Sequence, residues 1–253
     1  MPLRSFMSFL SLASLLIAGN SFAAEGHHWG YAGEGGPAEW GKLSPDNKAC
    51  SMGKRQSPID INDGNKKENK SLPQLMFSYI AAPLKILNNG HTIQMNYPQG
   101  SKVTIGPSTY DLLQFHFHTP SEHAFNGKRT ELEVHFVNKG TDGSLAVVGI
   151  LMKKGKKNSE LESLFNKMPS QAGKEDAIEN STINPNALLP KDKDYYTYPG
   201  SLTTPPCSEI VTWYVIKDKI EVSEEQIKKF QKLFPMNARP LQSISSRIVE
   251  EKD

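Results

Sequence analysis

The sequence predicts a mainly β protein (α+β in schemes that give weight to its helices) that folds as a single domain with a few short helices. Glycine and proline supply 19 and 17 of the 253 residues and are spread along the chain, as expected for many short strands joined by turns. Helical periodicity is sparse, and neither a repeat nor a low-complexity linker divides the chain. The length suits one large domain or two small ones, and the missing linker favours one.

Short runs rich in β-branched and aromatic residues predict the strands. In chain order they are Leu84–Leu87, Thr92–Tyr97, Lys102–Ile105, Asp111–His118, Glu131–Asn138, Ser144–Lys153, Ile210–Ile216 and Ile220–Val222. The aromatic and glycine-rich segment Gly26–Gly41 is expected to form an irregular arm before them. Glu160–Met168 and Ser223–Phe234 are candidate helices, the second with a capping box of Ser223 and Gln226. Asn186–Pro190 is expected to form a single turn.

The N-terminal segment has the features of a secretory signal peptide. Arg4 supplies a positive charge, Phe6–Ala18 is apolar apart from serines, and Ser21–Ala23 has small residues at the two positions that a signal peptidase reads. We therefore expect residues 1–23 to be removed and residues 24–253 to form a secreted or periplasmic domain. A membrane anchor is the alternative, but the run is shorter than the roughly 20 apolar residues of a bilayer span.

The charge balance argues against a nucleic-acid partner. Of the 29 basic residues Arg4 leaves with the leader, so 28 basic residues face 27 acidic ones in the mature chain. Binding to nucleic acid needs a concentrated basic face. The lysine clusters Lys66–Lys67 and Lys153–Lys157 are interpreted as solvated loop tips.

Cys50 and Cys207 form an even pair in a chain that we expect to be exported, which favours a disulfide. The bridge would close a loop of over 150 residues, for which the chain-entropy model gives about 5 kcal/mol as an upper figure. Metal-binding or catalytic thiols are the alternative, but neither cysteine has a second one near it.

One predicted strand alternates histidine with phenylalanine. Gln114, His116 and His118 share one face of it, because strand side chains alternate between faces. Phe115 and Phe117 share the other face and can bury in a core, which leaves the histidines lining a cleft. Imidazoles two residues apart on a strand lie roughly 6–7 Å apart, close enough to share one metal ion.

A second strand places Glu131, Glu133, His135 and Val137 on one face. If it pairs antiparallel with the first strand, His135 completes a set of three histidines. Three neutral imidazoles with an open fourth position are typical of a catalytic zinc site. Gln114 and Glu133 each precede a histidine by two residues on the same face, so they are the natural acceptors for the second ring nitrogens.

Spacing alone leaves the metal and the reaction open. His116 and His118, followed after three residues by Glu122, also fit the cupin pattern. That β-barrel binds iron or manganese through two histidines, a glutamate and a later histidine. A cupin-type metal oxygenase and a three-histidine zinc enzyme are therefore close competitors at this point.

Longer motifs distinguish the three-histidine zinc enzyme from the cupin. They are His28–Tyr31, Gln56–Ile61, Asn88–His91, Gln114–His118, Ser121–His123, Glu131–His135, Tyr198–Pro206, Val211–Trp213 and Asn237–Pro240. Through these segments nearly the whole mature chain resembles the α-class carbonic anhydrases, of the secreted bacterial type. The resemblance implies a large, twisted, mostly antiparallel central sheet. It also implies reversible hydration of carbon dioxide to bicarbonate and a proton, by attack of hydroxide held on zinc.

The resemblance assigns a role to each matching residue. It implies that His116, His118 and His135 bind one zinc ion, with Gln114 and Glu133 as hydrogen-bond partners of His116 and His135. Thr203 would hydrogen-bond the hydroxide, and Glu122 would accept the threonine's hydroxyl proton. The remaining matches are Thr204 beside the substrate, Val137, Val147, Leu202 and Trp213 in the apolar wall that receives carbon dioxide, and Tyr31, Asn89 and Gln94 around the cavity water.

His91 matches the family's proton shuttle. An unperturbed histidine titrates at about 6.5, which suits proton transfer near neutrality. The Asn-Gly pair before it signals a turn, so a mobile imidazole is expected, with a plain surface histidine as the alternative. His27 and His28 are candidates for a second relay or incidental metal ligands. His123 is interpreted as a hydrogen-bonding structural residue.

The partners implied are carbon dioxide and bicarbonate, with no nucleic acid and no membrane span once the leader is removed. The chain is expected to be a monomer or a homodimer. The matching cysteine pair bridges in many secreted bacterial relatives, where it would hold the Thr203 loop. An inactive binding domain with the same fold is a further alternative, but such relatives typically lose one zinc histidine, and this chain keeps all three.

Overall fold

One large twisted sheet of 12 strands dominates the computed structural model, which describes residues 28–253. The predicted signal peptide and His27 lie outside the described residues. In chain order the strands of this sheet are β2 (Lys66–Glu68), β3 (Leu75–Ser78), β4 (Ala82–Asn88), β5 (Ile93–Asn96), β6 (Lys102–Ile105), β7 (Ser108–His118), β9 (Leu132–Gly140), β10 (Leu145–Lys154), β11 (Lys174–Ile183), β12 (Tyr195–Gly200), β13 (Val211–Val222) and β14 (Val249–Glu251).

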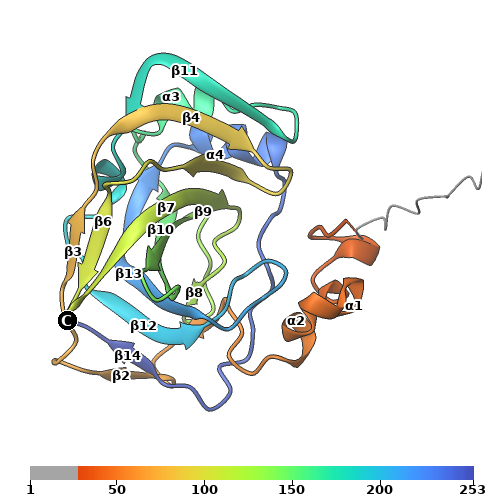
Figure 1. The fold of residues 1–253 in the computed structure, drawn as a ribbon, viewed down its shortest axis with the longest axis vertical. Coiled ribbons are helices and arrows are strands. Elements are labelled where there is room, and N and C mark those ends of the chain that lie inside the picture. Colours follow the sequence, from red (N-terminus) through yellow and green to blue (C-terminus); the bar gives the residue numbers. More distant parts are fainter. Residues whose placement is uncertain (1–27) are drawn as a thin grey trace, which may run out of the picture.

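The strand order places the histidine strands in the middle of the sheet. The order is β11-β4-β5-β7-β9-β10-β13-β12-β14-β2, and β3 pairs with β6, which in turn pairs with β7 (Figure 1). Most neighbours are antiparallel, while β10–β13 and β14–β2 are parallel. A separate two-stranded sheet joins β1 (Asp60–Ile61) to β8 (Ala124–Phe125). The expected mainly β fold with a mostly antiparallel central sheet is confirmed.

The helices among the described residues are short. They are α1 (Trp40–Leu43), α2 (Ala49–Met52), α3 (Glu162–Asn166) and α4 (Glu224–Leu233), with 3-10 turns at Gly33–Gly35, Pro45–Asn47 and Pro185–Leu188. At the start of α4, Ser223 and Gln226 form the predicted capping box. In residues 28–253 no helix is long and apolar enough to cross a membrane.

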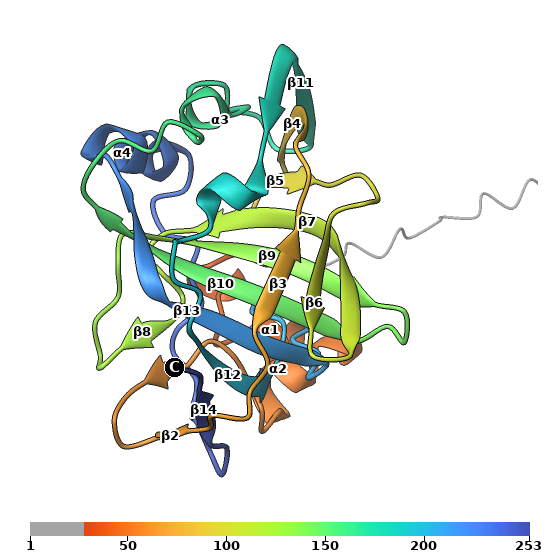
Figure 2. The same ribbon diagram turned by 90° about the vertical axis from the view of Figure 1, so that its left-hand side faces the viewer.

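The two faces of the sheet bury different sets of side chains. The larger core includes Phe115, Phe117 and Phe136, which are completely buried. Phe117 packs against Phe165 and Phe230, from α3 and α4, which lie together at one end of the sheet (Figure 2). The opposite face carries a smaller cluster that contains Ile59, Val147, Tyr198, Trp213 and Val249. The histidines lie on this second face.

Several elements differ from the sequence-based expectation. The predicted strands Ile210–Ile216 and Ile220–Val222 form the single strand β13, with an irregularity opposite Ile150–Met152. β1, β2, β3, β8, β11, β12 and β14 were not predicted. The interpretation of the lysine clusters as loop tips was wrong in part, since Lys66 and Lys67 lie in β2 and Lys153 and Lys154 end β10. The arm that begins the described chain is irregular as far as Glu39 apart from the 3-10 turn at Gly33–Gly35, and α1 follows.

The arm packs around the disulfide. Cys50, on α2, is bridged to Cys207, which confirms the predicted pairing. Trp40 is fully buried beside the bridge, and Trp29 and Tyr31 pack against the same cluster. The indole nitrogen of Trp40 donates to the backbone oxygens of Gly30 and Gly35. The bridge therefore joins α2, which follows the arm, to the loop after Thr203.

Candidate metal centre

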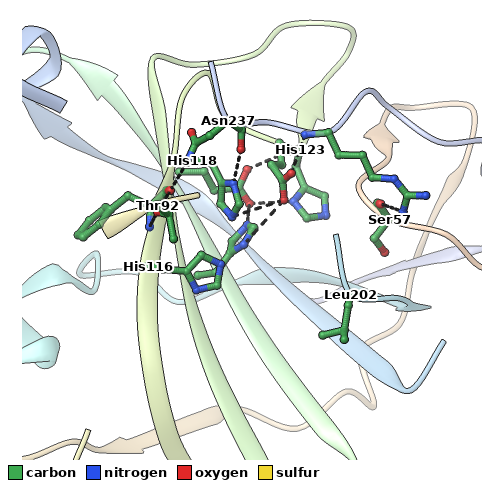
Figure 3. Close-up of polar contacts among 12 residues, drawn as sticks. Ser57, Thr92, His116, His118, His123, Leu202 and Asn237 are labelled. Atoms are coloured by element: carbon green, nitrogen blue, oxygen red, sulfur yellow. Dashed lines mark hydrogen bonds and ion pairs between the residues drawn. The ribbon is translucent and has the colours of Figure 1, made fainter. Parts of the chain in front are cut away.

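The three histidines predicted to bind metal meet on one face of two adjacent strands. In the antiparallel pair of β7 and β9, His116 lies directly opposite His135. His118 follows two residues later on β7, and the centroids of the three rings lie 4.6, 4.9 and 5.3 Å apart. Figure 3 shows His116 and His118 projecting from the same side of β7. The alternation of the strand accounts for this arrangement.

Two of these imidazoles are oriented by a residue on their own strand. His116 Nδ1 lies 2.7 Å from Gln114 Oε1, and His135 Nε2 lies 2.8 Å from Glu133 Oε1. Because an amide or carboxylate oxygen only accepts, each of these ring nitrogens carries the proton. The other nitrogen of each neutral ring therefore presents a lone pair, as a metal ligand must.

His118 is oriented by a residue that the sequence did not reveal. Its Nδ1 lies 2.8 Å from the backbone oxygen of Asn237, which lies above it in Figure 3. The Asn237 side chain in turn donates to the backbone oxygens of His91 and Phe117. Within residues 28–253, His118 Nε2 is buried without a hydrogen-bond partner. One nitrogen of each of the three rings lies within 4.8 Å of the other two, so the set fits a single metal ion.

The surroundings favour neutral ligands. Burial lowers the pKa of His118, and burial together with the neighbouring histidines holds the pKa of His116 well below its ordinary value. Burial opposes ionisation of Glu133, but the charges and hydrogen bonds of His123 and His135 hold its pKa well below the usual range. Three neutral imidazoles, one of them backed by a carboxylate, match the donor set of a zinc site.

Glu122 reaches the same site from the loop between β7 and β8. Glu122 is fully buried, and its Oε1 accepts a hydrogen bond of 2.8 Å from the backbone of Arg239. Its Oε2 lies 3.6 Å from His118 Nε2 and 4.0 Å from His135 Nδ1. This oxygen has no hydrogen-bond partner in the described part of the chain, and no bond there joins it to Thr203. Thr203 is 6% exposed.

An apolar wall lies beside His135. Val147 is opposite Val137 on one side and Trp213 on the other, so the three meet across β9, β10 and β13. The Trp213 ring lies 4.8 Å from that of His135, and Leu202 packs against the same cluster. The four residues expected to receive carbon dioxide therefore belong to one surface.

A cavity of about 110 Å³ opens next to His116 and His118. It is lined by the predicted polar residues Tyr31, Asn89 and Gln94 and also by Thr204. The Asn89 amide donates to Gln94 Oε1 at 3.2 Å. Burial raises the pKa of Tyr31 well above its ordinary value, so the phenol keeps its proton. These residues surround the space on the open side of the histidines.

His91 lies at the edge of this cavity. Its ring stacks on Trp29, with centroids 3.6 Å apart and planes 7° from parallel, and the His28 ring lies 5.5 Å away. The Asn89 side chain accepts hydrogen bonds from the backbone of His91 and Thr92, which forms the turn signalled by Asn-Gly. Burial, with a smaller contribution from His28, lowers the pKa of His91.

A family model described as eukaryotic-type carbonic anhydrase matches residues 35–253. The chain belongs to this family. It is 40% identical over 252 residues to a carbonic anhydrase of Nostoc sp., covering 96% of each chain. It is 42% identical over 227 residues to a carbonic anhydrase of Klebsiella pneumoniae, covering 88% of this chain and 91% of the relative. The resemblance noted in the sequence and the enzyme class that it implied are confirmed.

Solved structures of the same fold agree. The α-carbonic anhydrase of Thermovibrio ammonificans, in complex with the inhibitor sulfanilamide, matches with a TM-score of 0.85 and 43% identity, over 88% of this chain and 98% of that one. Dioscorin in complex with ascorbate matches with a TM-score of 0.83 and 32% identity, over 89% and 98%. The cupin alternative is therefore set aside, since both the family and the sheet topology differ from a cupin barrel.

Proposed function

We propose that this chain hydrates carbon dioxide reversibly, with one zinc ion bound by His116, His118 and His135. The observation that carries the proposal is the convergence of three ring nitrogens whose opposite nitrogens already have hydrogen-bond partners. Zinc in such a site lowers the pKa of a bound water to about 7, which supplies a nucleophile at neutral pH. Membership of the family and the curated relatives named carbonic anhydrase support the activity.

Glu122 and Thr203 would fix the direction of the hydrogen bonds on the open side of the metal. A carboxylate only accepts, so Glu122 Oε2, which has no other hydrogen-bond partner in the described residues, would accept the proton of the Thr203 hydroxyl. The Thr203 oxygen is then left as an acceptor toward the reacting position. With the hydrogen bonds in this direction, the nucleophile would donate its proton to Thr203 and keep a lone pair toward the substrate.

The apolar wall gives the substrate a place beside that position. Carbon dioxide is small and uncharged, so it is bound by desolvated apolar surface rather than by a charged clamp. Val137, Val147 and Trp213 supply that surface next to His135, with Leu202 at its border. Thr204 lines the wetter side, where the charged bicarbonate product can leave in exchange for water.

His91 would carry the proton out of the site. Its lowered pKa leaves the imidazole unprotonated at neutral pH, so it is ready to accept a proton from cavity water. Tyr31, Asn89 and Gln94 line the space between His91 and the zinc ligands and can hold that water in place.

We further propose that residues 1–23 are a signal peptide and that residues 24–253 act in the periplasm or medium, as a monomer or a homodimer. The disulfide supports this location, because such bridges persist in oxidising compartments.

The function is tested by stopped-flow hydration of carbon dioxide and by zinc content, measured on the same mature protein. We expect about one zinc per wild-type chain and a rate far above that of buffer. His135→Ala should lose most of both, because it removes one of three ligands, while the control His28→Ala should keep the metal. A zinc-loaded wild type that hydrates no faster than buffer would refute the activity, and full zinc content in His135→Ala would refute the site.

A further inference from the structure

A chain of buried hydrogen bonds runs from the back of His135 away from the metal site. Glu133 Oε1 lies 2.8 Å from both His135 Nε2 and His123 Nδ1. Glu133 Oε2 accepts the backbone N–H of His123 at 2.8 Å. On the other side of its ring, His123 Nε2 lies 2.6 Å from the hydroxyl of Tyr198. These side chains are at most 1% exposed, so water cannot replace any of these bonds.

The chain continues from Tyr198 to the start of the Thr203 loop. The Tyr198 hydroxyl lies 3.1 Å from Ser57 Oγ, which accepts the backbone N–H of Ser201. In return, Ser57 donates its backbone N–H to Ser201 Oγ, and Ser201 donates its hydroxyl to the backbone oxygen of Leu202. Figure 3 shows Ser57, His123 and Leu202 on this side of the site. Thr203 is the next residue.

The protons of this chain can be placed by starting from the group that can only accept. Glu133 can only accept, so His135 Nε2 and His123 Nδ1 are both donors to it. A neutral His123 then offers a lone pair at Nε2, which the Tyr198 hydroxyl must fill. The geometry also allows Tyr198 to donate to Ser57 Oγ, at 3.1 Å, but its single proton can serve only one of these two contacts.

The opposite arrangement, in which protons are donated from His123 toward Ser57, leaves one donor without an acceptor. If His123 were doubly protonated, it would donate to Tyr198, and Tyr198 would donate to Ser57. Ser57 Oγ already accepts from Ser201, so its own hydroxyl proton would have no acceptor among the bonds found in the described residues. A buried donor without a partner is costly. Complete pairing therefore favours donation by Tyr198 to His123 Nε2, at 2.6 Å, over donation to Ser57 Oγ, at 3.1 Å.

We propose that Tyr198 is a positioning residue for the metal site. Its hydroxyl fixes the tautomer of His123, and His123 in turn holds Glu133 so that His135 keeps Nε2 protonated and Nδ1 free for the metal. The same hydroxyl ties this set to the Ser57–Ser201 pair, which anchors the residues just before Thr203. This inference rests on the proposed metal site, but the hydrogen-bond chain itself needs no metal ion.

Tyr198→Phe tests the proposal because it removes one hydroxyl and little volume. Loss of a direct hydrogen-bond partner of a ligand costs roughly 10- to 100-fold in metal affinity, and Tyr198 acts two residues further out, so we expect metal loss to a chelator to be about three- to tenfold faster. In proton NMR spectra of the metal-free protein, the N–H signals of His123 Nδ1 and His135 Nε2 should shift or broaden. A role in packing alone would leave those signals in place.

The matched control is Tyr79→Phe. Tyr79 is also buried, and its hydroxyl donates to Asn138 Oδ1 at 2.8 Å on the other side of the sheet. It should change neither the two imidazole signals nor the rate of metal loss. If Tyr79→Phe accelerates metal loss as much as Tyr198→Phe, the effect is general destabilisation and the proposal fails.

Ser57→Ala gives a second, milder test one bond further out, which decides the matter if Tyr198→Phe does not fold. It should shift the same two N–H signals by less, and combined with Tyr198→Phe it should add little, because both act through one chain. Unchanged signals and an unchanged rate of metal loss in a folded Tyr198→Phe or Ser57→Ala protein would overturn the proposal. A wild type that binds no zinc would instead refute the proposed function, and the signals of the metal-free protein would still test the chain.

Discussion

Phe117 and His118 are neighbours on β7, both almost completely buried, yet they face different surroundings. The Phe117 ring packs in the apolar core, with centroids 5.3 Å from Phe165 and 6.0 Å from Phe230. His118 contacts a backbone oxygen at 2.8 Å and a carboxylate at 3.6 Å. On the face that carries Phe117, the free energy of unfolding depends on how completely side chains fill the core, and neighbouring side chains can move to fill part of a cavity. On the face that carries His118, the free energy depends on individual hydrogen bonds, which are directional.

The largest effects should come from replacing Phe117 and His118 by alanine, one at a time. His118→Ala removes a ligand, so we expect zinc to be lost and hydration to fall by more than about a thousandfold, with little change in folding of the metal-free protein. Phe117→Ala leaves a cavity and should lower the free energy of unfolding by about 3–5 kcal/mol. Below its unfolding transition it should still bind zinc. Denaturant unfolding and zinc analysis of both variants check this, and a Phe117→Ala protein that folds but cannot hold zinc would contradict the separation of the faces.

Removing the disulfide should affect stability and the site together. The bridge closes a long loop between Cys50 and Cys207, with a separation of 157 residues, so a double replacement by serine should cost about 2–5 kcal/mol of unfolding free energy. The Cys207 backbone also donates to the Thr204 oxygen at 2.8 Å, so the loop that carries Thr203 should loosen. We expect hydration to fall while zinc content holds, as measured on protein that is still folded. Equal activity per folded molecule would show that the bridge acts on stability alone.

How much of the fold could be predicted depends on where each strand lies in the sheet. The central strands β7, β9 and β10 alternate or are continuously apolar, and their approximate ranges were predicted. β11 is an edge strand with mostly exposed residues, so its sequence has no apolar face to detect. β13 was split in two because the polar residues Lys217–Lys219 interrupt its apolar pattern where the sheet is irregular. Edge position and irregular register are tertiary properties that local patterns do not carry.

The residues that orient the metal ligands also differ in how well the sequence predicted them. Gln114 and Glu133 could be chosen as orienting partners because a period of two puts them beside His116 and His135 on the same strand. Asn237, which orients His118 from 119 residues away, leaves no trace in local spacing. The backbone of Arg239 likewise holds Glu122 from 117 residues away. Contacts between loops that are distant in the sequence become visible only in the folded structure.

A smaller effect should follow from adding a methyl group at Gly149. This residue faces His135 across β9 and β10, and a Cβ there would lie 2.8 Å from Glu133 Oε1, so the carboxylate must move. We expect Gly149→Ala to weaken zinc binding by about tenfold, as for other disturbed partners of a metal ligand. Gly30→Ala, where a Cβ meets nothing within 4 Å, is the matched control. Competition with a chelator measures both, and equal affinities would show that the polar face tolerates displacement as the apolar face does.

The smallest effect concerns pH, to which the histidine face of the sheet should respond and the phenylalanine face should not. Burial lowers the pKa of His116 and His118, whereas in the unfolded chain a histidine titrates near 6.5. Between the folded and unfolded pKa values the unfolded chain binds more protons, so the stability of the metal-free protein is complete above about pH 6.5 and falls as the pH drops below it. The slope is at most about 1.4 kcal/mol per pH unit for each group.

Urea unfolding of the metal-free protein between pH 7.5 and pH 5 measures this slope. Replacing His118 by Asn should make it shallower, because one depressed group is removed, whereas Phe117→Leu should lower the whole curve without changing its slope. Zinc should shift the loss of stability to lower pH, since the metal competes with protons for the same nitrogens. A slope that is unchanged in the His118 variant would mean that groups elsewhere dominate the acid response, and the polar face would then differ from the apolar face in geometry but not in its coupling to protons.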